Sequence, residues 1–131
     1  MSTPLYKKLG IKSDSKIVVL NLSEKYIDFF SDFPPNVVIN DTCSEPDSGF
    51  VHIFVQTLPE LDTYFKTAKT CLARNGMLWI SWPKKASDII SEVDKFKVMK
   101  HGLSRGLVDT KIASIDKTWS ACKFVYRMKD R

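Results

Sequence analysis

The sequence predicts a single α/β domain, residues 1–131, with a mainly parallel sheet that ends in an antiparallel hairpin. The first reason is that strand-like segments alternate with segments of helical period, as in parallel sheets joined by right-handed crossovers. The second is that residues 107–115 and 119–128 are strand-like and joined by a short turn, which is typical of a hairpin. We expect this hairpin at the edge of the sheet.

Four segments have the composition of parallel strands. Residues 17–20 (IVVL) form a continuous β-branched run, as expected where helices cover both faces of a sheet. The other runs are short, apolar and bounded by turn-forming residues or proline. We therefore predict strands at residues 17–22, 37–39, 50–55 and 77–82.

Helical period is clearest over residues 58–73. Thr57 and Glu60 have capping-box spacing, and apolar residues recur there at intervals of three and four. A second helix is expected over residues 23–33, where aromatic residues fall at helical spacing before two prolines.

Two further helices complete the predicted elements. A short one lies between Pro4 and Gly10, since proline suits a first helical turn and glycine a carboxyl cap. A longer one is expected from about Ser87 to Gly106. Its buried stripe would consist of Ile89, Val93, Phe96, Met99 and Leu103.

Composition predicts a mixed, well-solvated surface around one core. The net charge of +5 comes from 20 basic and 15 acidic residues that are interspersed along the chain. Hydrophobic residues make up 44%, which is enough for a single core. A basic stripe of the kind that binds nucleic acid is not evident, so the sequence disfavours that partner.

Cysteine usage and the lack of targeting segments predict a cytoplasmic location. Cys43, Cys71 and Cys122 are odd in number, far apart and without metal-ligand spacing, so we expect reduced thiols. The first residues carry no apolar signal segment, and no apolar run approaches the ~20 residues that span a bilayer. We expect no membrane contact.

Ligands of parallel sheets bind beyond the carboxyl ends of the strands. This rule selects candidate residues after the first, third and fourth predicted strands. They are Asn21, Ser23, Glu24 and Tyr26, then Gln56 and Thr57, and finally Ser81, Trp82, Lys84 and Lys85.

The run Trp82-Pro83-Lys84-Lys85 is the strongest of these candidates. Two lysines after a strand can neutralise a phosphate or carboxylate, and an indole can stack on a planar ligand or a cation. Alternatively, Trp82 caps the sheet while both lysines solubilise a loop. The residues alone leave these two interpretations open.

No catalytic or metal-binding constellation is visible in the sequence. His52 lies within an apolar strand, which favours a hydrogen-bonded core histidine over a general base. His101 falls late in a predicted helix, where a cation suits the helix dipole. Paired carboxylates and the H-x-x-x-H and G-x-S-x-G patterns are missing. We expect no catalytic residues and no metal.

Several stretches resemble known families. Residues 9–12 (LGIK) before the first strand, and 72–76 (LARNG) before 77–81 (MLWIS), resemble S-adenosylmethionine-dependent methyltransferases. Residues 78–85 (LWISWPKK), with Trp119-Ser120, more specifically resemble a family of short bacterial proteins described only as a domain of unknown function. That resemblance covers nearly the whole chain. It implies a truncated, three-layer Rossmann-like fold and no established activity.

The chain departs from the methyltransferase pattern at the cofactor site. The resemblance implies glycines after the first strand, where the cofactor approaches the backbone, but this chain has Ser23-Glu24-Lys25-Tyr26. It also implies an acidic residue after the second strand, and only Asn40 or Asp41 stands there. The short connection over residues 40–49 omits the strand and helix of the adenine side. We therefore expect no cofactor.

Three functions remain open from the sequence. The first is a non-catalytic or regulatory methyltransferase-like domain that binds a small anionic ligand or a protein partner. The second is an S-adenosylmethionine-dependent methyltransferase with an atypical loop, in which amides after Leu22 and the side chain of Glu24 replace the glycine contacts. The third is nucleic-acid binding through dispersed lysines, without the interleaved aromatics that such sites use. The oligomeric state is not defined by the sequence.

Overall fold

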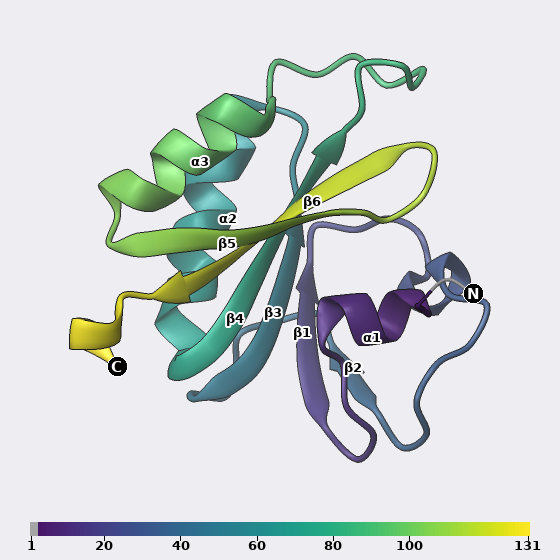
Figure 1. Ribbon diagram of the computed structural model, residues 1–131, viewed down its shortest axis with the longest axis vertical. Helices are drawn as coiled ribbons and strands as arrows, with labels where there is room; N and C mark the ends of the chain where they lie inside the picture. The colour runs from purple at the N-terminus through teal and green to yellow at the C-terminus, as the bar shows by residue number, and fades with distance from the viewer. Residues whose placement is uncertain (1–2) are drawn as a thin grey trace.

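The computed structural model describes residues 3–131 and contains one six-stranded mixed sheet in the order β2-β1-β3-β4-β6-β5 (Figure 1). The first four strands are parallel, and β6 runs antiparallel to both β4 and β5. The predicted α/β fold with a C-terminal antiparallel pair is therefore confirmed. The strands are β1 (Lys16–Leu20), β2 (Val38–Asn40), β3 (Ser48–Phe54), β4 (Leu72–Pro83), β5 (Leu107–Ser114) and β6 (Trp119–Tyr126).

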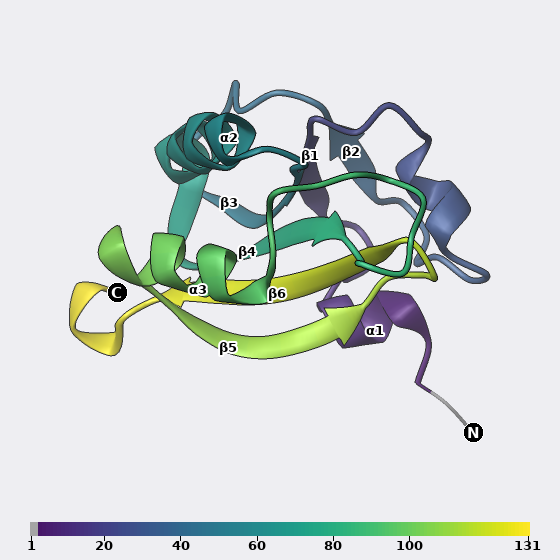
Figure 2. The same cartoon turned by 90° about the horizontal axis from the view of Figure 1, so that it is seen from above.

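Helices cover both faces of this sheet (Figure 2). Side chains of α2 and α3 share one buried cluster with the sheet, whereas residues of α1 and η1 belong to the cluster on the other face. Strand β1 shows the alternation, because Val18 and Leu20 join the first cluster while Ile17 and Val19 join the second. The helices are α1 (Leu5–Leu9), η1 (Tyr26–Phe29), α2 (Leu58–Cys71), α3 (Lys95–Ser104) and η2 (Met128–Asp130).

Helix α2 forms where its capping residues predict it. Thr57 Oγ1 accepts a hydrogen bond from Glu60 N at 3.1 Å, and Glu60 Oε1 accepts one from Gln56 N at 2.7 Å. These bonds satisfy amides that the first turn would otherwise leave unpaired. Leu61, Phe65 and Ala68 then lie on the buried face. The prediction of a helix over residues 58–73 is thus confirmed to within two residues.

The helix expected over residues 23–33 is wrong. The structure has only the 3-10 turn η1 there, with Phe30 already in extended conformation. Tyr26 is buried, and Phe29, Phe30 and Phe33 pack partly buried against the same cluster. The helical spacing of these aromatic residues indicated that their rings lie on one side of the chain. The single turn η1 is enough to place them there, and the prolines that follow prevent a longer helix.

The helix expected from Ser87 begins instead at Lys95. Asp94 is its amino cap, with Oδ1 accepting a hydrogen bond from Lys97 N at 2.9 Å. The expected buried stripe is also wrong in part, because Phe96 is 74% exposed and Leu103 is 43% exposed. Val98 and Gly102 face the sheet instead, and Gly102 lets the helix approach the ring of Phe124 closely.

The expectation of three reduced cysteines is wrong for two of them. Cys43, in the connection between β2 and β3, forms a disulfide with Cys71 at the end of α2. Cys122 is free and buried, and burial raises the pKa of its thiol to about 12. The sequence does not reveal the pair, since the two cysteines are 28 positions apart along the chain and only the fold brings them together. No helix within residues 3–131 has the length and apolar character needed to cross a membrane.

Candidate functional site

The side chain of Asn21 bridges two strand ends just beyond the first strand. Asn21 adopts a positive φ of 62° directly after β1. Its amide Nδ2 donates a hydrogen bond to Phe54 O, at the end of β3, over 2.8 Å. Asn21 therefore links the carboxyl ends of two neighbouring parallel strands, where a ligand of this fold would lie.

Tyr26, His52 and Ser81 form a buried hydrogen-bonded chain. Tyr26 Oη lies 2.8 Å from His52 Nδ1, and His52 Nε2 lies 2.7 Å from Ser81 Oγ. His52 and Ser81 are fully buried on adjacent strands β3 and β4. The imidazole also stacks on Phe54, with ring centroids 4.4 Å apart. The structure thus places the candidates Tyr26 and Ser81 within the core.

Burial keeps this chain of hydrogen bonds neutral. Desolvation lowers the pKa of His52 to about 3 and raises the pKa of Tyr26 well above its ordinary value. Every polar side-chain atom of the three residues has a partner, so the network specifies the core packing. The interpretation of His52 as a hydrogen-bonded core residue fits this geometry, although neither partner could be identified from the sequence.

The remaining loop candidates lie outside the core. Ser23 and Glu24 are exposed. Neither side chain has a hydrogen-bond partner among the described residues. The loop therefore carries exposed side chains where the methyltransferase pattern has a glycine turn. The nearest carbonyl at a strand end, that of Phe54, already accepts a hydrogen bond from Asn21. These residues do not fit the methionine part of S-adenosylmethionine.

A groove lies instead beside the end of β4. It has a volume of about 290 Å³, and an adjoining hollow follows the loop between β4 and α3, which arches above the sheet in Figure 1. Its walls combine apolar and basic side chains, namely Trp82, Lys84, Lys85, Lys95, Phe96 and Ile112. The structure thus brings together three candidates from the predicted run and adds residues of α3 and β5.

The two lysines after β4 differ in how firmly they are held. Lys84 Nζ donates to Ser114 Oγ at 2.7 Å, and Lys84 N donates to Thr118 O at 2.7 Å. Both bonds tie the loop to the β5–β6 hairpin, and the ammonium has no acidic partner among the residues that the structure describes. Lys85 is exposed and forms no ion pair among residues 3–131. Of these two lysines, Lys84 is held by hydrogen bonds and Lys85 extends from the surface beside it.

Trp82 lines the groove as a nearly buried side chain. Its side chain is only 6% exposed and packs with Val93 in the core. The indole N–H has no acceptor within the described part of the chain, unlike that of Trp79, which donates to Leu9 O at 2.9 Å. Most of the side chain is covered, so Trp82 offers little of its ring as a stacking face.

A second group of charged side chains connects α2 with the end of α3. Asp62 accepts from Arg105 at 2.9 Å and lies 3.2 Å from Lys66 Nζ. The hydrogen bond from Lys66 lowers the pKa of Asp62. His101 packs edge-on against Phe65, and desolvation lowers the pKa of the imidazole. No group of three or more metal-ligating side chains occurs within residues 3–131.

Comparison with known proteins identifies the fold. No family model and no curated protein matches the chain. A SAM-dependent methyltransferase from Aquifex aeolicus aligns with 92% of this chain and 86% of its own, at 11% identity and a TM-score of 0.60. A TehB-like SAM-dependent methyltransferase from Corynebacterium glutamicum aligns with 92% and 85%, at 12% identity and 0.57. The fibrillarin pre-rRNA processing protein of Methanococcus jannaschii aligns with 88% and 67%, at 13% identity and 0.57.

The chain therefore has the Rossmann-like fold of SAM-dependent methyltransferases. At identities of 11–13%, the structural alignment shows the fold alone and does not show the activity. In this chain Asn21 bridges the ends of β1 and β3, and a groove lies beside the end of β4.

Proposed function

We propose that this protein is a non-catalytic binding domain that holds a small phosphate-bearing ligand in the groove beside β4. The observation that carries the proposal is the set of cations there: Lys84, Lys85 and Lys95 line one groove together with apolar side chains. Asp94 is the acidic residue in the lining, and its carboxylate already caps α3. Several ammonium groups match the charge of a phosphate, while Phe96 and Ile112 suit an apolar body.

The rest of the site supports binding rather than chemistry. The histidine nearest the strand ends, His52, is buried, and its pKa of about 3 keeps the imidazole neutral between two hydroxyl groups. A general base needs to reach the proton that it abstracts. The groove lining contributes lysines, an indole and apolar residues, which bind and orient an anion.

Replacing Lys85 by alanine should weaken the binding of phenyl phosphate, a probe with a phosphate and an apolar ring, by about tenfold. The reason is the loss of one charge-assisted hydrogen bond, worth ~1.5 kcal/mol. Amide chemical-shift titration by NMR measures the dissociation constant and locates the site. Thermal stability should not change, since an exposed lysine contributes little to folding.

Lys25→Ala is the matched control, because Lys25 is an exposed lysine in the loop after β1. It should bind the probe as the wild type does. Equal affinity of Lys85→Ala and wild type, or weakening by Lys25→Ala instead, would move the site away from the groove.

The alternative hypothesis, that the protein is an S-adenosylmethionine-dependent methyltransferase, leads to a separate prediction. Its support is the fold shared with SAM-dependent methyltransferases. S-adenosylmethionine should nevertheless bind weakly or not at all, because Glu24 and Tyr26 follow β1 in place of glycines that allow close backbone approach. Calorimetric titration of the purified protein checks this. Saturable micromolar binding would favour the enzyme and count against the binding-domain proposal.

A further inference from the structure

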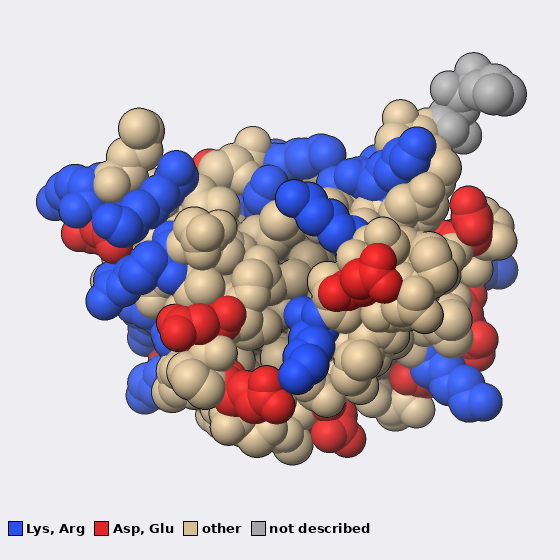
Figure 3. Space-filling view, turned by 90° about the horizontal axis from the view of Figure 1, so that it is seen from below, with Lys and Arg blue, Asp and Glu red and all other residues tan. Residues whose placement is uncertain are grey.

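A separate pocket opens at the opposite edge of the sheet, where the parallel strands begin. Figure 3 views the molecule from this side and shows basic and acidic side chains interspersed around tan surface. The pocket has a volume of about 320 Å³. Three segments meet around it: the turn from α1 to β1, the start of β3 and the early part of β4.

A bulge in β4 shapes one side of this pocket. Ser48 of β3 pairs with Leu72 of β4, but Phe50 pairs with Met77, so one residue of β3 spans four of β4. Gly76 is required in the bulge, because a Cβ there would lie 2.8 Å from Ser48 O. Bulges of this kind re-aim side chains and commonly lie beside functional sites. Here the bulge carries Asn75 to the rim of the pocket.

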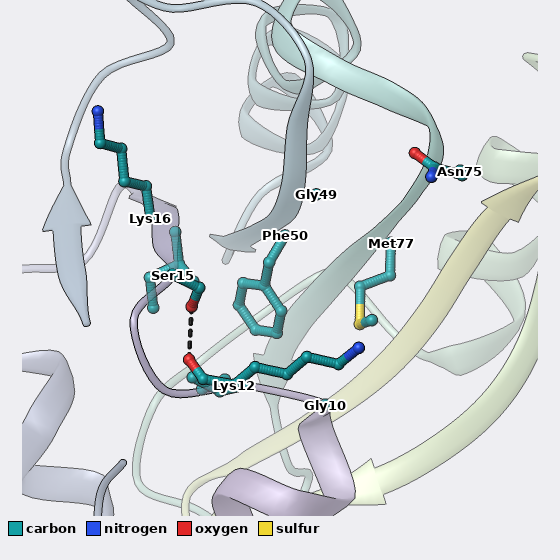
Figure 4. A pocket seen from close by; sticks show the side chains of 10 residues that line it. Gly10, Lys12, Ser15, Lys16, Gly49, Phe50, Asn75 and Met77 are labelled. Carbon is teal, nitrogen blue, oxygen red and sulfur yellow. Dashed lines mark hydrogen bonds between the residues drawn. The ribbon is translucent and has the colours of Figure 1, made fainter. Parts of the chain in front are cut away.

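The floor of the pocket is apolar and its rim is polar (Figure 4). Phe50 and Met77 face the centre, between Asn75 on one side and Lys12 on the other. The pocket is completed by the backbone of Gly10 and by Ile11 and Ile17. A flat apolar group of modest size suits this floor.

The two lysines of the rim play different parts. Lys16 turns away from Phe50 in Figure 4, and its Nζ lies 3.6 Å from Glu45 Oε2. Lys12 extends along the pocket and has no ion pair among the described residues. Its backbone is fixed by Ser15, whose Oγ donates to Lys12 O at 2.6 Å. Lys12 is therefore the uncompensated cation of the pocket.

We propose that this pocket binds a small carboxylate with a flat apolar body, such as an aromatic acid. The ammonium of Lys12 supplies the charge that complements a carboxylate, and the amide of Asn75 is a further hydrogen-bond donor on the rim. The ring of the ligand packs on Phe50 and Met77. The site is independent of the groove beside β4, which takes its cations from other elements.

Benzoate is the probe for this site, followed by NMR amide shifts on the full chain. Saturable changes should centre on Lys12, Gly49, Asn75 and Gly76. Lys12→Ala should weaken benzoate binding about tenfold, and neutral benzyl alcohol should bind the wild type more weakly than benzoate by a similar factor. Thermal melting should stay unchanged, because Lys12 is exposed.

Lys16→Ala is the matched control, since it removes the same charge from the same rim where Glu45 already compensates it. It should bind benzoate nearly as the wild type does. The proposal fails if shifts cluster elsewhere, if Lys12→Ala retains wild-type affinity, or if both lysine variants weaken binding equally. Loss of phenyl phosphate binding in Lys85→Ala bears only on the other groove, so the two proposals stand or fall separately.

Discussion

Replacing Gly102 by alanine is expected to lower the free energy of unfolding by about 2 kcal/mol. A Cβ at this position would lie 2.6 Å from Cδ2 and 2.8 Å from Cζ of Phe124, which is fully buried. Overpacking of a core typically costs up to ~3 kcal/mol, whereas alanine gains ~1 kcal/mol over glycine in a helix interior. Packing therefore outweighs helix propensity. Urea denaturation measures the difference.

Two further variants test the cause. Gly49→Ala should change stability by less than ~0.5 kcal/mol, because a Cβ there meets nothing within 4 Å. Phe124→Leu combined with Gly102→Ala should destabilise less than the sum of the two single changes, since a smaller side chain relieves the overlap. A Gly102→Ala variant as stable as the wild type would show that α3 does not approach β6 as described.

Lowering the pH from 6.5 to 4.5 is expected to remove about 2 kcal/mol of stability through His52 alone. Its pKa is about 3 in the folded protein, below the ordinary 6.5. In the unfolded chain the imidazole of His52 therefore becomes protonated below about pH 6.5, whereas in the folded protein it becomes protonated only near pH 3. Stability is full above pH 6.5 and falls as the pH decreases through this window.

Chemical denaturation at several pH values, with His52→Gln as the variant, checks this prediction. Glutamine does not titrate, so the variant should lose most of the slope, whatever its stability at pH 7. His101→Gln is the control, and it should keep the loss of stability at low pH that His52 causes. The lowered pKa of His101 adds to this loss in the wild type, so the variant should lose only that smaller part of the pH dependence. Direct NMR titration of the His52 ring gives a second measurement. A ring that protonates near pH 6.5 would rule out the buried neutral state.

The elements that the sequence predicts well are those determined by neighbours along the chain. The β-branched run at residues 17–20 is a strand because both sheet faces are covered, and Thr57 with Glu60 begins α2 through local hydrogen bonds. Asp94 could have been recognised as a cap for α3 in the same way. The apolar pattern that included Phe96 favoured an earlier start for α3. Close packing of Gly102 against Phe124 instead determines which face of this helix is buried.

The parts that the sequence could not predict depend on contacts between distant residues. Ser81 and Tyr26 lie 29 and 26 positions from His52, and only strand pairing and the turn η1 bring them into one network. The groove shows the same division. Trp82, Lys84 and Lys85 were selected as a local run after a strand, whereas Lys95, Phe96 and Ile112 join it only through tertiary packing.

The position of β6 has a consequence for how the sheet forms during synthesis. The last strand of the chain lies between β4 and β5, and the order of the sheet offers β5 no other neighbour. When the ribosome has made residues up to 114, the backbone amides and carbonyls of β5 therefore still lack their strand partner. Because synthesis runs from the amino terminus, β5 emerges before β6. Unpaired strand edges of this kind make a nascent domain prone to aggregation. The sheet is complete only when β6 has emerged and paired with both β4 and β5.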